Sequence, residues 1–273
     1  MPGSVATLAG RGMAMAMGVG DADRRRMVAR HQQRAHGGTL SPPALRRAVQ
    51  RAFDSYARYW VESFRLPQLT AADLDAGMEY EGYEHLHDAL AEGKGAILTI
   101  PHLGGWDWAG SWFATQGIPI TVIVEPLEPP ELFEWFADFR RSLGMRVVPL
   151  GPQAASASIA ALKENGVLCL LSDRGIGTSL VEVEFFGEKT MLPAGAAMLA
   201  LRTGAPILPV GVYYRDHMHR GVVRPRLAVE RTATLRDDVA RVTQQVADEL
   251  EALIRRAPEQ WHLMQPNWPS DRE

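Results

Sequence analysis

Short apolar runs alternate with helical segments through the middle of this chain, and this alternation constrains its fold more than any other feature. Four β-branched or leucine-rich runs are predicted strands, at 96–100, 118–124, 146–150 and 167–171. The segments between them are predicted helices, at 106–116, 130–143 and 156–164. Helical connections of this length join parallel strands. We therefore predict an α/β fold with a mostly parallel central sheet and helices on both faces.

The flanking segments extend the same pattern. Ser41, Pro42 and Pro43 are typical of a helix start, and apolar residues recur at helical spacing up to Trp60. Further helices are expected at 73–91, 193–203 and 235–256, and further strands at 181–186, 206–213 and 222–229. The expected organisation is a divergent or partly disordered segment, 1–40, followed by a single α/β domain, 41–273.

Composition excludes several classes of protein. With 273 residues, 46% of them hydrophobic, the chain can bury a large core as one domain. A net charge of −3 argues against a general nucleic-acid binder. The single cysteine, Cys169, lies in an apolar run, which indicates a buried hydrophobic residue and a reducing compartment. No apolar run approaches the roughly 18 residues of a bilayer span.

A histidine and an aspartate flank the glycines after the first of these strands. Pro101 ends the strand, and His102 and Asp107 stand five positions apart, about 140° on a regular helix. They can meet only if His102 lies in the turn before the helix and Gly104 and Gly105 fold the chain back. That arrangement suits a catalytic base, His102, and an orienting carboxylate, Asp107. The alternative is a helix cap beside a satisfied polar residue.

Other polar residues also follow strands directly. Glu125 follows one strand, and the pair Asp173 and Arg174 follows another. Ligands bind beyond the carboxyl ends of parallel strands, so one cleft can hold these side chains together with His102. The sequence contains no G-x-S-x-G elbow, Walker loop or G-x-G-x-x-G fingerprint. We therefore expect a base without a covalent nucleophile, and direct transfer to an acceptor hydroxyl.

Metal sites are not expected. His85 and His87 are two positions apart and do not share a helix face. Asp216, His217 and His219 lie at a predicted hairpin tip, 216–219, without visible supporting residues.

The stretch 24–65 is strongly basic. It holds two acidic residues, Asp54 and Glu62, and ten arginines, at positions 24, 25, 26, 30, 34, 46, 47, 51, 58 and 65. One interpretation is an amphipathic helix with solvated arginines, packed on the sheet. The other is a helix surface that lies against anionic lipid headgroups, each basic residue contributing about 1 kcal/mol.

Several motifs together resemble one family. They are PHLGGWDWAG around His102, FADFRRSLG at 136–144, SDRG followed by VEVEFFGE, LPAGAAMLALRTGAPILP at 192–209, and PEQWHLMQPNW near the end. This set resembles the phosphatidylinositol mannoside acyltransferases, which belong with the late acyltransferases of lipid A biosynthesis in the H-x4-D/E superfamily. The resemblance covers roughly 53–268.

The resemblance implies a membrane-associated enzyme, peripheral at the cytoplasmic face of the plasma membrane. It would move an acyl chain from acyl-CoA to a mannose hydroxyl of a glycolipid acceptor, without cofactor or metal. His102 would be the general base and Asp107 its partner, with four residues binding substrate: Glu125, Arg140, Asp173 and Arg174. The family commonly has D-R-D where this chain ends in Gly175, and an arginine where Pro126 stands. These departures concern the acceptor more than the chemistry.

A long acyl chain requires an apolar groove. About fourteen methylenes at ~0.8 kcal/mol each give ~11 kcal/mol of transfer free energy. The small residues of 193–200 and the helix that begins at Trp106 are the expected walls. Arg174 and a backbone N–H of the glycine turn are alternative oxyanion donors. Two other functions are compatible with the residues: a lipid or acyl-chain binding protein without chemistry, and an acyl-CoA thioesterase in which water replaces the acceptor.

Overall fold

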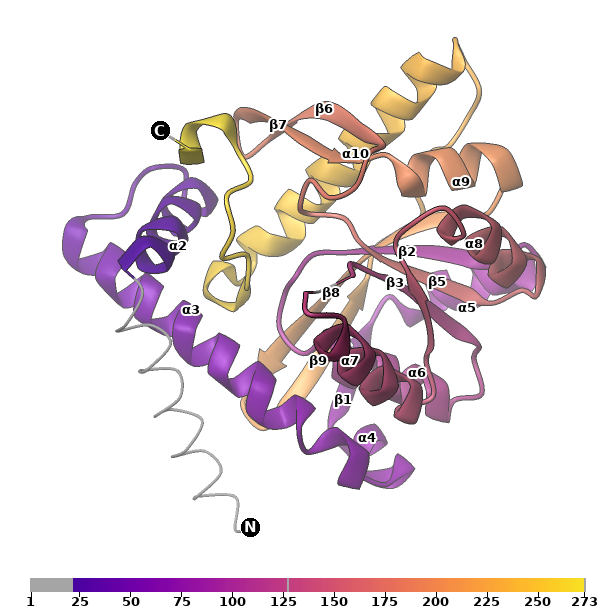
Figure 1. Cartoon of the computed structure of the whole chain (residues 1–273), viewed down its shortest axis with the longest axis horizontal. Helices are drawn as coiled ribbons and strands as arrows, with labels where there is room; N and C mark the ends of the chain where they lie inside the picture. Colours follow the sequence, from indigo (N-terminus) through magenta and orange to yellow (C-terminus); the bar gives the residue numbers. More distant parts are fainter. Residues whose placement is uncertain (1–21, 127, 273) are drawn as a thin grey trace.

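A computed structural model describes residues 22–126 and 128–272, and it is organised around one seven-stranded sheet (Figure 1). The strand order is β1-β9-β8-β2-β5-β3-β4, and every neighbouring pair is parallel except β8 and β9. The strands are β1 Met78–Glu81, β2 Ala96–Ile100, β3 Ile120–Val124, β4 Arg146–Pro149, β5 Val167–Leu171, β8 Ile207–Arg215 and β9 Met218–Val223. A separate hairpin pairs β6 Leu180–Phe185 with β7 Glu188–Pro193. The predicted α/β class with a mostly parallel sheet is confirmed.

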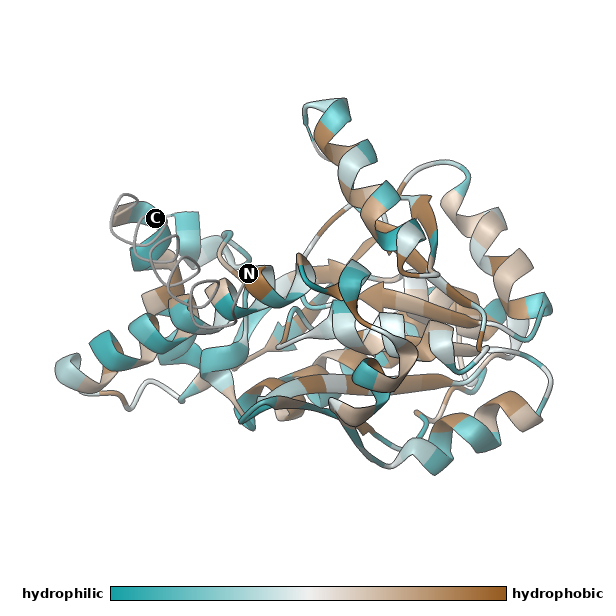
Figure 2. Cartoon of the chain, turned by 90° about the horizontal axis from the view of Figure 1, so that it is seen from below, coloured by the Kyte–Doolittle hydropathy of each residue, from teal (hydrophilic) through white to brown (hydrophobic). Residues whose placement is uncertain are grey.

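Helices cover both faces of the sheet. They are α2 Ala22–Ala35, α3 Pro42–Ser63, α4 Ala71–Ala76, α5 Tyr83–Ala91, α6 Trp106–Thr115, α7 Pro130–Ser142, α8 Ala154–Lys163, α9 Gly195–Thr203 and α10 Leu235–Arg255. Short 3₁₀ turns occur at Leu66–Gln68, Pro258–Gln260 and Pro269–Arg272. Figure 2 shows the hydrophobic residues concentrated on the strands, with hydrophilic residues on the helices around them. None of the described helices combines the length and apolarity that a bilayer span requires.

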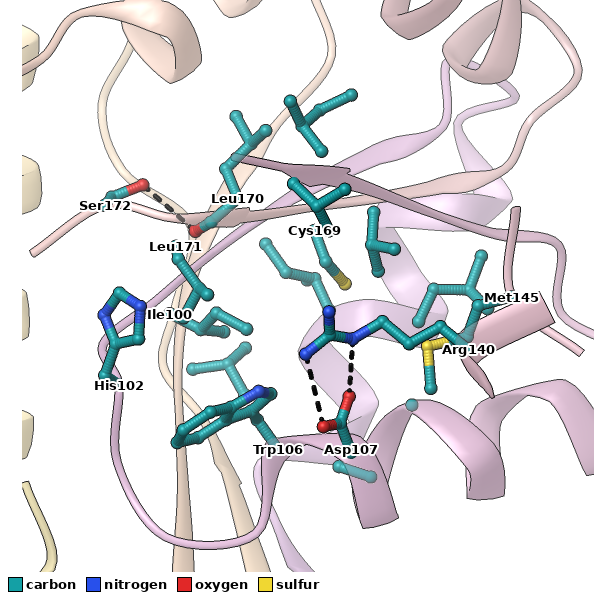
Figure 3. Close-up of a pocket in the computed structure, with 18 of the residues that line it drawn as sticks. Ile100, His102, Trp106, Asp107, Arg140, Met145, Cys169, Leu170, Leu171 and Ser172 are labelled. Carbon is teal, nitrogen blue, oxygen red and sulfur yellow. Dashed lines mark hydrogen bonds and ion pairs between the residues drawn. The ribbon is translucent and has the colours of Figure 1, made fainter. Parts of the chain in front are cut away.

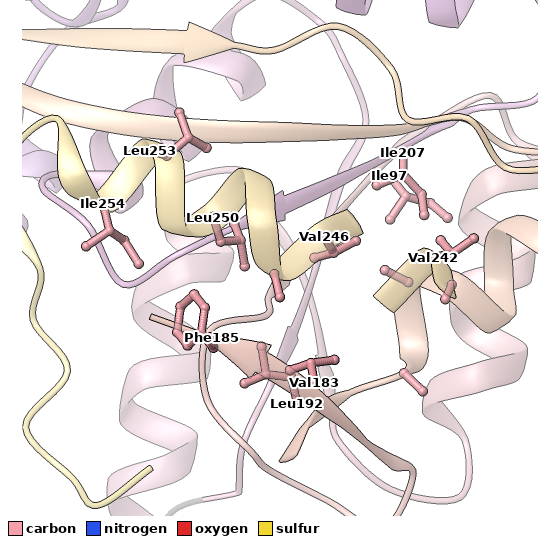
Figure 4. Close-up of a cluster of buried hydrophobic side chains, with 14 of the residues drawn as sticks. Ile97, Val183, Phe185, Leu192, Ile207, Val242, Val246, Leu250, Leu253 and Ile254 are labelled. Carbon is pink, nitrogen blue, oxygen red and sulfur yellow. The ribbon is translucent and has the colours of Figure 1, made fainter. Parts of the chain in front are cut away.

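Successive residues of β2 enter two different cores, because side chains alternate across a strand. Leu98 faces α5 and α6, whereas Ile97 faces α9 and α10. Helix α10 lies between the main sheet and the β6–β7 hairpin (Figure 4). Its residues Val242, Val246 and Leu250 belong to the same buried cluster as Ile97 of the sheet and Phe185 of the hairpin. Both faces of the strand that leads to His102 are therefore buried, and the strand end is held rigidly.

The predicted helix 73–91 is wrong, because this segment is divided into α4, β1 and α5. Gly77 ends α4, and Gly82 has a φ of +74° with the Val223 carbonyl packed where a side chain would begin. Between these glycines Met78–Glu81 alternates in burial and pairs with β9 as an edge strand. Two glycines thus break a helical pattern into three elements.

The predicted strand 222–229 is also displaced. The strand, β9, begins at Met218 and ends at Val223, and Pro225 lacks the N–H needed to continue the ladder. Within the predicted hairpin tip, 216–219, Met218 and His219 belong to the strand. His219 is buried and its Nε2 lies 2.8 Å from Glu62 Oε2.

The segment 1–40 was expected to be divergent or partly disordered. Its first 21 residues lie outside the described part, and helix α2 occupies much of the rest. This helix packs on α3 and on the chain end (Figure 1). Buried Asp271 accepts hydrogen bonds from His31 Nε2 at 3.2 Å and Arg34 Nη1 at 2.6 Å. The domain boundary at residue 40 stays a prediction, but α2 is tied to the C-terminus by charged and apolar contacts.

Candidate active site

His102 occupies the turn between β2 and α6, and its ring contacts a buried carboxylate. Nδ1 lies 2.7 Å from Asp173 Oδ1, and the His102 backbone N–H donates to Asp173 Oδ2 at 2.9 Å. Asp173 follows β5, the parallel neighbour of β2, so the sheet brings the two residues together across 71 positions of sequence. Because a carboxylate only accepts, this hydrogen bond keeps the proton on Nδ1 and leaves a lone pair on Nε2.

Asp173 is fully buried and remains ionised. Burial alone would raise its pKa, but the attraction of the protonated form of His102 and hydrogen bonds from His102 and Trp261 outweigh burial, and the pKa of Asp173 is lowered. Trp261 Nε1 donates to Asp173 Oδ2 at 2.8 Å. The His102 side chain is 21% exposed, whereas Asp173 has no exposed surface. One side of the imidazole is thus bonded to a buried anion, and the ring reaches the cavity.

The predicted hydrogen bond between His102 and Asp107 is not among those of the described residues, and Asp173 takes the place assigned to Asp107. The Asp107 carboxylate instead accepts from Arg140 Nε at 2.9 Å and from the Tyr59 hydroxyl at 2.5 Å. Asp107 is the second residue of α6, and its side chain faces α7 and α3. In Figure 3 Trp106 lies between the Asp107–Arg140 ion pair and His102.

The Asp107, Arg140 and Tyr59 contacts join three helices. Burial would lower the pKa of Arg140, but the Asp107 charge outweighs it and raises that pKa. Burial, reinforced by the same charge, raises the pKa of Tyr59. Arg140 therefore stays a guanidinium and Tyr59 a neutral phenol at neutral pH, and their bonds to Asp107 tie α6 to α3 and α7.

The remaining predicted residues also lie at this edge of the sheet. Glu125 follows β3, Arg174 follows β5, and their side chains form an ion pair. Both line the same cavity as His102, Asp107 and Arg140. Among the sequence-predicted residues, only Asp173 is withdrawn from the cavity, behind the imidazole.

The cavity has a volume of about 310 Å³ and a largely apolar lining. It opens where the strands separate, since β3 and β5 pair only as far as Val122 and Cys169. Its walls include Ala109, Gly110 and Phe113 of α6, Pro193 at the end of β7, and Gly195 and Ala196 at the start of α9. Both expected walls are therefore present, and the volume is in the range of small-molecule sites.

The C-terminal segment contributes contacts that sequence reasoning missed. The His262 backbone N–H donates to the His102 carbonyl at 2.7 Å, and Leu103 forms a β-bridge with Trp261. Burial, with a smaller effect of nearby His102, lowers the pKa of His262 to about 3, so its ring is neutral. The aromatic motif near the chain end indicated docking, but only the fold shows that it holds the His102 turn.

Cys169 lines the cavity in the middle of β5. Burial raises the pKa of its thiol to about 12, which agrees with the predicted role as a small hydrophobic residue. In the described part of the chain, His, Cys, Asp and Glu side chains form no group of three or more that could hold a metal ion.

Comparison with known proteins agrees with the motifs. The sequence model of the family described as bacterial lipid A biosynthesis acyltransferase matches residues 1–270. A phosphatidylinositol mannoside acyltransferase of Mycolicibacterium smegmatis is 38% identical over 226 residues, covering 82% of this chain and 73% of the relative. One from Mycobacterium tuberculosis is 39% identical over 225 residues, covering 81% and 70%. A lipid A biosynthesis acyltransferase of Haemophilus influenzae is 28% identical over 187 residues, covering 67% and 56%. The predicted resemblance is confirmed, and the chain belongs to the bacterial lipid A biosynthesis acyltransferase family.

Proposed function

We propose that this protein transfers a long acyl chain from acyl-CoA to a mannose hydroxyl of a phosphatidylinositol mannoside, with His102 as general base and no covalent enzyme intermediate. The observation that carries the proposal is the His102–Asp173 contact of 2.7 Å at the mouth of an apolar cavity. The names of the relatives support the glycolipid acceptor.

In the proposed step Nε2 of His102 takes the proton of the acceptor hydroxyl. The hydroxyl oxygen forms a bond to the thioester carbonyl carbon, and the carbon–sulfur bond then breaks. The imidazolium returns its proton to the departing CoA thiolate. Asp173 stabilises the transient imidazolium, as a buried carboxylate does in other His-dependent acyl transfers.

Developing negative charge on the carbonyl oxygen needs a donor. The Gly104 backbone N–H already donates to the Gln260 carbonyl at 3.0 Å, which disfavours this N–H as the oxyanion donor. Arg174 lines the cavity and contacts Glu125 through one Nη. Its Nε has no hydrogen-bond partner among the described residues, so the guanidinium keeps a donor for the oxyanion. We therefore assign the oxyanion to Arg174, and a wall-forming role to the Asp107–Arg140 pair.

A lipid acceptor requires access from a membrane. Helices α3 and α7 meet in an aromatic patch formed by Trp60, Phe64, Trp135 and Phe136. Phe64 and Trp135 are each 48% exposed, and their ring centroids lie 5.9 Å apart. Helix α7, which carries part of the patch, also contributes Arg140 to the cavity wall. Aromatic rings favour the membrane interface. We assign this patch to the bilayer, at the cytoplasmic face where acyl-CoA is present.

The arginines of the basic stretch 24–65 include some in internal ion pairs and others that are exposed. Arg34 and Arg58 form internal ion pairs, with Asp271 and Glu62. Arg46, Arg47 and Arg51 are exposed on α3, which packs on α2 and the C-terminal segment and touches the sheet near its end through Glu62 and His219. Sedimentation with anionic vesicles should therefore fall as salt rises, and absent or salt-insensitive binding would remove the role of the arginines.

The test is a product assay with purified protein, phosphatidylinositol mannoside, and either palmitoyl-CoA or palmitoyl-acyl carrier protein. We expect one acyl chain added to the glycolipid, with CoA released in equal amount. Free fatty acid as the sole product would instead identify a thioesterase, and donor binding without any product would identify a carrier. Product from the acyl carrier protein alone would refute the CoA assignment.

A further inference from the structure

We propose that Gly110, Phe113, Ile120 and Met145 form the closed end of the acyl cavity and set the longest chain that the protein accepts. This inference rests on the proposed function, since it takes the cavity to hold the acyl group. The four residues are called the floor below.

The floor lies at the far end of the cavity from His102. Residues His102, Glu125 and Arg174 follow the carboxyl ends of their strands, whereas Ile120 is the first residue of β3. Gly110 and Phe113 are one and two turns along α6 from its start. In Figure 3 Met145 lies on the opposite side of the Asp107–Arg140 pair from His102. An acyl chain with its carbonyl at His102 therefore points its terminal methyl at the floor.

The floor is tightly packed. Phe113, Ile120 and Met145 are buried in one core cluster and also line the cavity. A Cβ added to Gly110 would lie 2.5 Å from Met145 Cε and 3.0 Å from Met145 Sδ. The absence of a side chain at position 110 thus lets the Met145 side chain lie against α6.

The strand length gives the scale of the cavity. From Ile120 to Glu125 the chain spans about 16 Å at ~3.3 Å per residue. An extended polypeptide advances ~3.5 Å per residue, or ~1.2 Å for each of its three backbone bonds. An extended acyl chain with the same advance per bond would fit about thirteen bonds into this length. Thirteen bonds join about fourteen carbons, the same number as the methylenes counted above for the groove.

Changes to the floor should move this limit in opposite directions. Gly110→Ala displaces the flexible end of Met145 into the cavity and shortens the preferred chain by about two carbons. Met145→Ala removes Cγ, Sδ and Cε and lengthens it by about as much. Each methylene gained or lost changes the relative rate about fourfold, so two change the ratio of products about 15-fold. The double variant has no clash and should shift toward longer chains, like Met145→Ala.

The experiment is a competition among equimolar C12 to C20 acyl-CoA donors, with the acylated glycolipids counted by mass spectrometry. Gly151→Ala is the matched control, because Gly151 is not among the residues that line the cavity and an added Cβ there meets nothing within 4 Å. We expect shorter products from Gly110→Ala, longer ones from Met145→Ala, and an unchanged profile from Gly151→Ala. Unchanged profiles in both floor variants, or a shift in the control alone, would overturn the assignment.

A second measurement separates this inference from the proposed function. Quenching of protein fluorescence by each acyl-CoA, without acceptor, reports chain-length preference in binding, since Trp106 lines the cavity. A wild-type protein that forms no acyl glycolipid from any donor would refute the proposed function. The same opposite shifts in binding would then still support the floor, and equal binding profiles in all variants would refute it.

Discussion

Replacing Asp173 by asparagine tests the electrostatic core of the site without changing its shape. The amide oxygen can still accept from the His102 backbone N–H and Trp261 Nε1, the two bonds to Oδ2. The amide NH₂ then faces Nδ1, which must offer its lone pair. The ring proton moves to Nε2, and the group proposed as the base is blocked.

The size of the effect follows from the lost charge. An imidazolium and a carboxylate about 4 Å apart attract by ~4 kcal/mol at an effective dielectric of 20. At 1.36 kcal/mol per tenfold change in rate, Asp173→Asn should lower transfer by about 10³-fold. Donor binding should change little, because Asp173 does not line the cavity.

Single-turnover transfer of palmitoyl-CoA to the glycolipid, followed by mass spectrometry at saturating donor, measures this step. A thermal melt checks that the variant is folded at the assay temperature. A variant that retains transfer within about fivefold of the wild type, while folded, would refute the role of Asp173.

Three further predictions concern the surroundings. Asp107→Asn leaves Arg140 without its buried charged partner, so denaturant titration should show a loss of about 3 kcal/mol in the free energy of unfolding. The same variant should lower single-turnover transfer far less than Asp173→Asn. The raised pKa of Cys169, about 12, leaves roughly one thiol in 10⁴ ionised at pH 8, so Ellman's reagent should label it only after unfolding. Asp271→Asn should lower the free energy of unfolding by about 2 kcal/mol. Since folding lowers the pKa of Asp271, that stability is complete above about pH 4 and is lost as the pH falls, and equal acid unfolding of variant and wild type would contradict this.

The central strands could be predicted because their signal is local. The run 96–100 is apolar throughout and is bounded by Gly95 and Pro101, so a buried strand is the simplest interpretation. The edge strand β1 has no such signal, since half of Met78–Glu81 is acidic. Its pairing with β9 depends on a strand that lies about 140 residues further along the chain.

The partner of His102 was missed for a related reason. A carboxylate five positions away invites pairing, but the start of α6 directs Asp107 toward Arg140 and Tyr59. Asp173 was placed at the same sheet edge by the strand pattern, yet its contact with His102 requires that β5 be the direct neighbour of β2. Strand order depends on packing between distant segments and leaves little trace in local sequence.

The most direct test of the proposed chemistry compares the wild type with His102→Ala in a single-turnover reaction of palmitoyl-CoA with phosphatidylinositol mannoside. General base catalysis contributes about 10²- to 10⁴-fold, so the variant should lose ester formation by at least that factor while still binding palmitoyl-CoA. Ester formation at a near-normal rate by the folded variant would contradict His102 as the base.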